Sequence, residues 1–218
     1  MTPSHHSPDT VLAEYALGTA SPALALMVAT HLTLCPTCRA RVEALEAIGG
    51  RMLEDEAETA LQPGEIDALM ALLDGPPPAE KEPGPSDPAG VFPRPLVRYI
   101  GGVDAQRWQW RLPSVRAVDV PAESADTLPL RVVRLNRGYR LPVHDHAGVE
   151  RAVILAGGWE DQTGEYHRGD FFYADTELRE HDQRCFPDED CILLVLNDAA
   201  IVPRNPFIRW VLKRVPPL

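Results

Sequence analysis

Three side chains that bind metals lie close together near the N-terminus, in the segment His31-Leu-Thr-Leu-Cys35-Pro-Thr-Cys38. On a helix, His31 and Cys35 are four residues apart and therefore share one face. Pro36 ends that helix and suits the first turn of the next one, where the free backbone amides favour a thiolate at Cys38. Imidazole and thiolate ligands at a helix–helix corner are typical of tetrahedral zinc. The alternative is a pair of buried free cysteines beside an unrelated histidine.

A closed zinc site needs a fourth ligand. The adjacent His5 and His6 each offer an imidazole from the N-terminal end of the chain, and the sequence leaves open which of them binds. We therefore expect one tightly held zinc ion within residues 1–75.

A second group of possible metal ligands lies in the pattern Gly138-x5-His144-x-His146-x3-Glu150-x6-Gly157. The two histidines and the glutamate have the same parity, so on a single strand their side chains point to one face. Two imidazoles and a carboxylate inside a barrel bind a divalent metal. The alternative is a set of polar side chains in a solvent-exposed loop.

Two further histidines compete for a fourth position in this second group. His181 lies beyond the next pair of predicted strands and can approach from a neighbouring strand. His167 lies in the turn-like segment 164–169, where we expect it to be exposed. The sequence therefore favours His181.

Helix signals predict how the first group is positioned. Helices are expected to begin at Pro8, Pro22, Pro36 and Gly64, after N-caps or at a proline in the first turn. The third ends at Gly49-Gly50 or continues to Glu58, and the fourth ends at Gly75. We expect a small bundle of about four helices with a core of its own, a size at which a bound metal adds needed stability.

The composition changes sharply after this helical unit. Residues 76–95 contain eight prolines and few apolar residues, so they cannot bury enough surface to fold and are expected to form a linker. The linker divides the chain into a helical domain at residues 1–75 and a second domain at residues 96–218.

Alternating apolar residues predict an all-β second domain from Leu96 onward. Turns containing glycine, proline and asparagine separate the strands at regular spacing, which is typical of a sandwich or barrel. We expect strands at 108–112, 115–120, 131–135, 151–155, 170–173 and 191–196, and a strand or short helix at 207–215.

Charge and cysteine content restrict the function. The 218 residues carry a formal net charge of −11, which argues against direct nucleic-acid binding and suits a basic protein partner. Four cysteines without a disulfide framework indicate a reducing cytoplasm. The polar start of the chain is not a signal peptide, and the apolar run at 23–34 is too short to span a membrane.

The two motifs together resemble a known family over nearly the whole chain. The pattern from Gly138 to Gly157 resembles the first cupin motif and implies a jelly roll. The second cupin motif is weaker, because Asp175 and Glu177 stand where proline and glycine are usual. The helical unit resembles the zinc-binding anti-sigma domains, with His6 matching their upstream histidine. A helical unit of this kind followed by a cupin is similar to the ChrR-type anti-sigma factors.

The resemblance implies both ligand sets and a function. It implies zinc at His6, His31, Cys35 and Cys38. It also implies a second divalent metal, expected to be zinc, at His144, His146, Glu150 and His181. Members bind an extracytoplasmic-function sigma factor in the cytosol and keep it from core RNA polymerase. They are associated with responses to singlet oxygen, which implies a non-enzymatic regulator with a sensory cupin.

Two other functions remain open. One is a cupin oxygenase or isomerase with a helical oligomerisation domain, since such a metal can activate dioxygen or water. The other is a zinc-dependent adaptor for a different partner. A thiol switch is disfavoured, because Cys35 and Cys38 are the only cysteines of the helical unit and Cys191 is expected to be a buried core residue.

Overall fold

The computed structural model describes residues 2–75, 85–123 and 127–212. Its first three helices are α1 (Asp9–Ala16), α2 (Pro22–Leu34) and α3 (Pro36–Glu54). They follow the start signals: Ser21 caps α2 by accepting the backbone N–H of Leu24, and proline occupies the first turn of both α2 and α3. Helix α3 continues through Gly49-Gly50 and ends at Glu54, between the two predicted ends.

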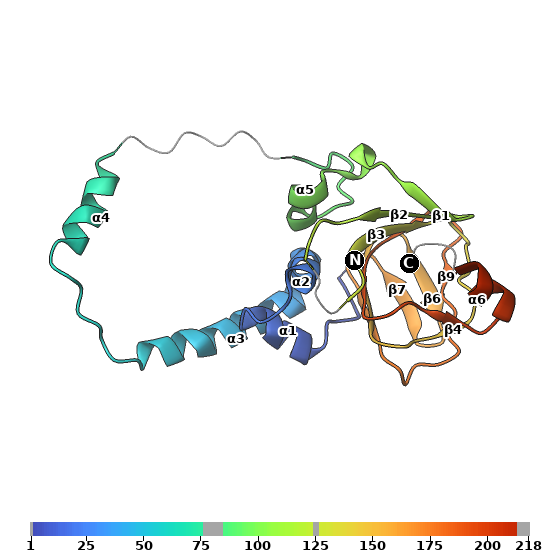
Figure 1. Ribbon diagram of the computed structural model, residues 1–218, viewed down its shortest axis with the longest axis horizontal. Helices are drawn as coiled ribbons and strands as arrows, with labels where there is room; N and C mark the ends of the chain where they lie inside the picture. The colour runs from blue at the N-terminus through green and yellow to red at the C-terminus, as the bar shows by residue number, and fades with distance from the viewer. Residues whose placement is uncertain (1, 76–84, 124–126, 213–218) are drawn as a thin grey trace.

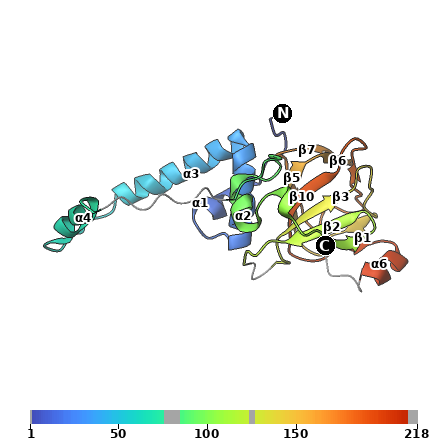
Figure 2. The ribbon, with the colours of Figure 1, turned by 90° about the horizontal axis from the view of Figure 1, so that it is seen from above.

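Helix α4 (Glu65–Leu73) forms where it was predicted but stands apart from the other helices. None of its residues is buried. The second half of α3 and all of α4 project away from the body of the molecule, as both ribbon views show (Figures 1 and 2). Three helices therefore pack together, and the fourth buries none of its residues against the described part of the chain.

A helix was missed at the start of the second domain. The expectation of β structure from Leu96 is wrong, because α5 (Arg94–Ile100) and a 3₁₀ turn η1 (Val103–Ala105) come first. Pro93 and Pro95 lie at the start of α5, and Gly101 ends it with a φ of +76°. The high proline content of residues 76–95 led us to predict a linker there, although Pro93 and Pro95 are also helix start signals.

The β domain is built on a six-stranded antiparallel sheet. Its strand order is β1-β2-β3-β10-β5-β8. All six strands lie close to the predicted positions, at β1 (Gln109–Leu112), β2 (Val115–Asp119), β3 (Arg131–Leu135), β5 (Glu150–Ala156), β8 (Phe171–Ala174) and β10 (Cys191–Asn197).

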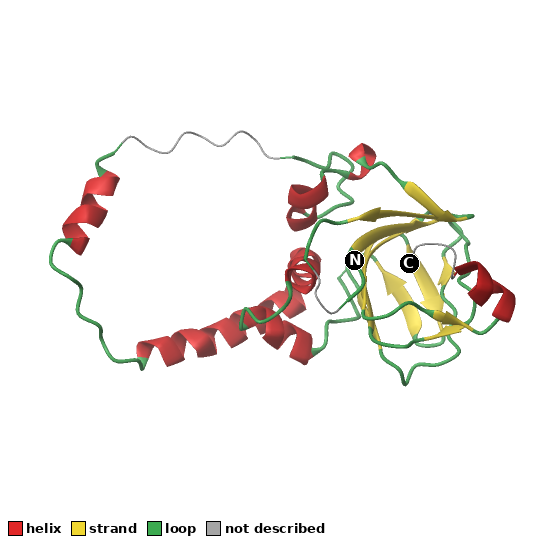
Figure 3. Cartoon of the chain, in the orientation of Figure 1, coloured by secondary structure: helices red, strands yellow, loops and turns green. Residues whose placement is uncertain are grey.

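Two smaller sheets complete the β domain, and their strands were not predicted. The first has the order β7-β6-β9, with β6 (Gly158–Asp161), β7 (Gly164–His167) and β9 (Arg184–Cys185). The second pairs β4 (His144–Asp145) with β11 (Val202–Pro203). The last described element is a helix, α6 (Pro206–Leu212), and residues 213–215 of the predicted terminal element lie outside the described residues. Figure 3 shows α1–α3 and α5 on one side of the strands and α6 on the other. The predicted class, helices followed by an all-β domain, is confirmed.

The six-stranded sheet separates two apolar clusters. Along its strands neighbouring residues point to opposite faces, so Val133 and Leu193 belong to one cluster while Val132 and Leu194 belong to the other. The inner cluster fills the β domain. The outer one continues into the buried side chains of α1, α2, α3 and α5, such as Leu96.

The helices therefore share their core with the sheet, and the expectation that the helical unit has a core of its own is wrong. The boundaries 1–75, 76–95 and 96–218 stay a prediction, and residues 76–84 of the linker lie outside the described part. Within that described part, no helix is both long and apolar enough to cross a membrane.

Candidate metal centres

The four predicted ligands of the β domain meet at one place, which we name the β-domain centre: His144, His146, Glu150 and His181. They do not lie on one strand, so the parity argument is wrong. His144 belongs to β4 and Glu150 begins β5, because the turn at 147–149 carries the chain from the small sheet to the large one. His181 comes from the neighbouring segment, and its carbonyl accepts the N–H of His144 at 3.1 Å.

Four ligand atoms of the β-domain centre converge. One nitrogen or oxygen from each residue lies within 4.8 Å of all the others. The Nε2 atom of His181 is 3.0 Å from the Nε2 of both His144 and His146. The Nε2 of His146 is 2.9 Å from Oε2 of Glu150. His144 and His181 are fully buried, so bulk water does not separate these groups.

The hydrogen bonds of two Nδ1 atoms determine which tautomer the rings of His144 and His181 adopt. Nδ1 of His144 lies 2.9 Å from the carbonyl oxygen of Pro142, and Nδ1 of His181 lies 3.3 Å from a carboxylate oxygen of Asp161. Both acceptors call for a proton on Nδ1, which leaves a lone pair on each Nε2. Lone pairs 3.0 Å apart repel each other unless a cation lies between them. The donor set therefore fits a divalent metal.

The surroundings of Glu150 favour the ionised form of its carboxyl group. Burial raises the pKa of its carboxyl group, but the adjacent imidazoles of His144 and His146 outweigh burial and hold that pKa well below its usual range. The carboxylate stays ionised, as a metal ligand must be.

The predicted zinc site of the helical unit, which we name the helical centre, brings together three of its four predicted ligands: His6, Cys35 and Cys38. Nδ1 of His6 is 3.3 Å from Sγ of Cys35, and that sulfur also accepts the backbone N–H of Cys38 at 3.4 Å. Of the two candidate histidines, His6 and not His5 lies against the thiols. Burial raises the pKa of Cys38 to about 11, so a metal must displace its proton in order to bind.

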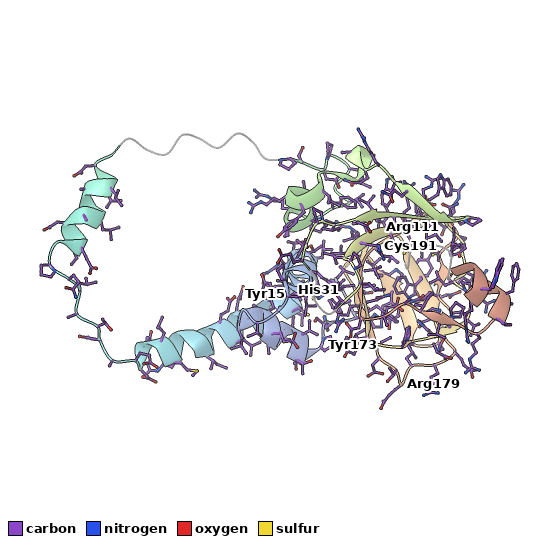
Figure 4. The ribbon with its side chains drawn as sticks, in the orientation of Figure 1. Tyr15, His31, Arg111, Tyr173, Arg179 and Cys191 are labelled. Atoms are coloured by element: carbon purple, nitrogen blue, oxygen red, sulfur yellow. The ribbon has the colours of Figure 1, made fainter. Side chains whose placement is uncertain are left out.

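His31 lies outside that group of three and remains a predicted ligand. Figure 4 shows its ring at the junction of α2 and the β domain. It makes a T-shaped contact with the ring of Phe171, with the ring centroids 5.3 Å apart. Both of its ring nitrogens are buried, and neither has a hydrogen-bond partner among the described residues, which fits a metal ligand. Burial lowers its pKa to about 4, so the imidazole is neutral at pH 7.

Sequence reasoning missed the residues that orient the ligands. Asp161 was not singled out, because its contact with His181 depends on strands β6 and β9, which were not predicted. His167 was expected in an exposed turn, but it ends β7, is half-buried and lies outside the β-domain centre.

The comparisons with known proteins agree with this geometry. Residues 100–200 match the family model of the ChrR cupin-like domain. The anti-sigma-E factor ChrR of Cereibacter sphaeroides is 38% identical over 221 residues, an alignment that covers 96% of this chain and 100% of that protein. The solved structure of Rhodobacter sphaeroides SigE in complex with the anti-sigma ChrR matches at a TM-score of 0.76 and 36% identity, covering 90% of this chain and 100% of that one. The predicted resemblance is thereby confirmed, and the chain belongs to the ChrR family of anti-sigma factors.

Proposed function

We propose that this chain binds an extracytoplasmic-function sigma factor in the cytoplasm and keeps it from core RNA polymerase. The proposal is supported by the solved complex of its relative ChrR with SigE and by one feature of the chain itself. That feature is the apolar surface of the projecting helices.

This projecting surface consists of large apolar side chains on α4, on the end of α3 and between the two helices. All of them are more than half exposed: Ile48, Met52, Leu53, Leu61, Ile66, Leu69, Met70, Leu72 and Leu73. A nine-residue helix is marginal in water, and one that buries nothing gains no stability from packing. Exposed apolar side chains gathered in this way mark a protein–protein interface.

Charge favours a basic partner for the projecting surface. Carboxylates lie among its apolar side chains, at Glu54, Asp55, Glu56, Glu58, Glu65 and Asp67, all of them exposed. Such a surface complements a protein that carries positive charge for binding DNA.

Co-purification tests this assignment. Each extracytoplasmic-function sigma factor of the source genome is co-expressed with the tagged full chain. We expect one of them to co-purify with the wild type and to be lost with the double variant Leu69→Glu, Leu72→Glu. The matched control is Phe207→Glu, because Phe207 is equally exposed but lies on α6 at the other end of the molecule (Figure 1). Equal retention of the sigma factor by the α4 variant would refute the assignment.

We also propose zinc at both centres, a non-enzymatic β domain, and release of the sigma factor on oxidative stress of the singlet-oxygen type sensed through that domain. Paired thiols and imidazoles favour zinc at the helical centre. Beside Glu150 lies an apolar cavity of about 50 Å³. Among the described residues that line it, only Glu150 carries a carboxylate and none carries an imidazole or an amine. Tyr139 is the other ionisable side chain of this lining, and burial raises its pKa above the ordinary value, which makes it a poor base at neutral pH.

A further inference from the structure

A chain of hydrogen bonds leads outward from the β-domain centre. Nδ1 of His181 lies 3.3 Å from one carboxylate oxygen of Asp161. The other oxygen of Asp161 accepts hydrogen bonds from both the hydroxyl and the backbone N–H of Thr163. His181 and the Asp161 side chain are fully buried, so water does not compete for this contact. The orientation of a metal ligand is thereby tied to the β6–β7 turn.

Tyr166 extends this chain along β7. Its hydroxyl oxygen lies 2.9 Å from Oγ1 of Thr163. Thr163 has one hydroxyl proton, which it donates to Asp161, so Tyr166 must be the donor in the second bond. The ring of Tyr166 is buried against Trp159 and Phe172 and has little freedom to move.

The ring of Tyr166 also contacts the ring of His5. The two rings stack with their centroids 4.1 Å apart. Backbone bonds also fix His5: its N–H donates to the buried carboxylate of Asp170 at 2.9 Å, and its carbonyl accepts the N–H of Phe171 at 3.0 Å. Asp170 accepts the N–H of Ser4 as well, at 2.7 Å. The N-terminal segment is thus held on the β domain immediately before His6, which lies against Cys35 in the helical centre.

The turn between β7 and β8 reaches the helical centre by a second route. Gly169 has a φ of +96°, and a Cβ built there would lie 2.7 Å from Cγ of Pro3 and 3.3 Å from Cβ of Leu34. Phe171 packs against the ring of His31. This turn and the first residue of β8 therefore touch the N-terminal segment, the end of α2 and the predicted fourth ligand.

We propose that Tyr166 and Asp170 are positioning residues that couple the two metal centres. A metal on Nε2 of His181 fixes that ring and, through Asp161 and Thr163, fixes Tyr166. Tyr166 and Asp170 hold His5, and this in turn holds His6 against the thiols. Coupling of this kind is reciprocal: metal at either centre strengthens binding at the other. The inference rests on the proposed metal binding and is independent of sigma-factor binding.

A double-mutant cycle on the full chain tests the coupling. Metal content is measured first for each variant, and the alkylation rates of Cys35 and Cys38 are then followed by peptide mass spectrometry. Glu150→Gln, which removes a ligand of the β-domain centre, should raise these rates at least about fivefold, the lower end of allosteric coupling. In Tyr166→Phe, which keeps the ring but loses the hydroxyl, adding Glu150→Gln should change the rates less than about twofold.

The matched control is Tyr173→Phe, on the neighbouring strand β8 but outside the hydrogen-bond chain, and it should leave the effect of Glu150→Gln intact. Asp170→Ala should raise the rates by itself, because it removes the carboxylate oxygen that accepts the backbone N–H groups of both Ser4 and His5. An effect of Glu150→Gln that is equal in the Tyr166→Phe and Tyr173→Phe backgrounds would overturn the proposal. The proposal would also be overturned if both centres bind metal and Glu150→Gln leaves the alkylation rates of Cys35 and Cys38 unchanged. A wild-type chain without metal at either centre would overturn the proposed metal binding as well.

Discussion

At the β-domain centre, one hydrogen bond per ring decides which nitrogen faces the other ligands. Pro142 and Asp161 accept hydrogen bonds from the Nδ1–H groups of His144 and His181, so both Nε2 lone pairs point inward. The sequence identified the histidines from their spacing, but not these two partners. A hydrogen bond to a backbone carbonyl cannot be inferred from residue types, and Asp161 is one of many acidic residues in the sequence.

Zinc at the helical centre is tested by removing one thiolate. Cys38→Ala should release the metal and lower the melting temperature, since binding energy at such a site contributes to folding energy. Cys185→Ala is the control, because it removes a buried thiol of the β domain that belongs to neither group of ligands, and should retain all the zinc. Metal analysis and thermal unfolding check the prediction. Full zinc occupancy with unchanged melting in Cys38→Ala would contradict it.

The burial of His31 predicts how stability depends on pH in the metal-free chain. Its folded-state pKa lies at about 4, below the ordinary 6.5, so between these values the unfolded state binds a proton that the folded state does not. The free energy of unfolding should therefore fall as the pH falls from 6.5 to 4, by up to about 3 kcal/mol from this residue.

Urea unfolding at several pH values after chelation measures this dependence. His31→Gln should show a shallower decline over the same window, because the substituted side chain does not titrate. Identical slopes for the wild type and His31→Gln would show that the buried imidazole is not the cause.

At the scale of elements, local signals predicted the helices and the long strands. Ser21-Pro22 and Cys35-Pro36 mark the starts of α2 and α3, and the apolar runs of β5 and β10 are buried on both faces of the sheet. The short strands escaped prediction because two or four residues carry too little periodicity. Helix α5 escaped because its prolines were read as linker composition. The stacking of His5 on Tyr166 joins residues far apart in sequence, so no local sequence pattern predicts it.

The shared core predicts that the helical unit is not independent. Residues 1–75 alone would expose the apolar side chains of α2 that pack on α5 and on the outer face of the six-stranded sheet. They would also lose the contact of His5 with Asp170 that positions His6. The zinc-loaded fragment should therefore melt well below the full chain and show exchange-broadened amide spectra. A fragment as stable as the full chain, with sharp and dispersed spectra, would contradict the shared core.

At the scale of the whole molecule, the chain divides into a packed body and a projecting arm. The body contains both candidate metal centres and the core that joins α1, α2, α3 and α5 to the sheet. The arm consists of the second half of α3 together with α4 (Figure 2). Its large apolar side chains are exposed. This division suits a regulator whose partner contacts the arm while the body holds the metals.

Transcription from purified components tests the central claim most directly. Core RNA polymerase, the co-purifying sigma factor and its promoter are assayed with increasing amounts of the full chain. The wild type and Phe207→Glu should abolish run-off transcript at about one chain per sigma factor. Leu69→Glu, Leu72→Glu should fail to do so at the same ratio. Undiminished transcription with the wild type, or equal inhibition by the α4 variant, would contradict the account.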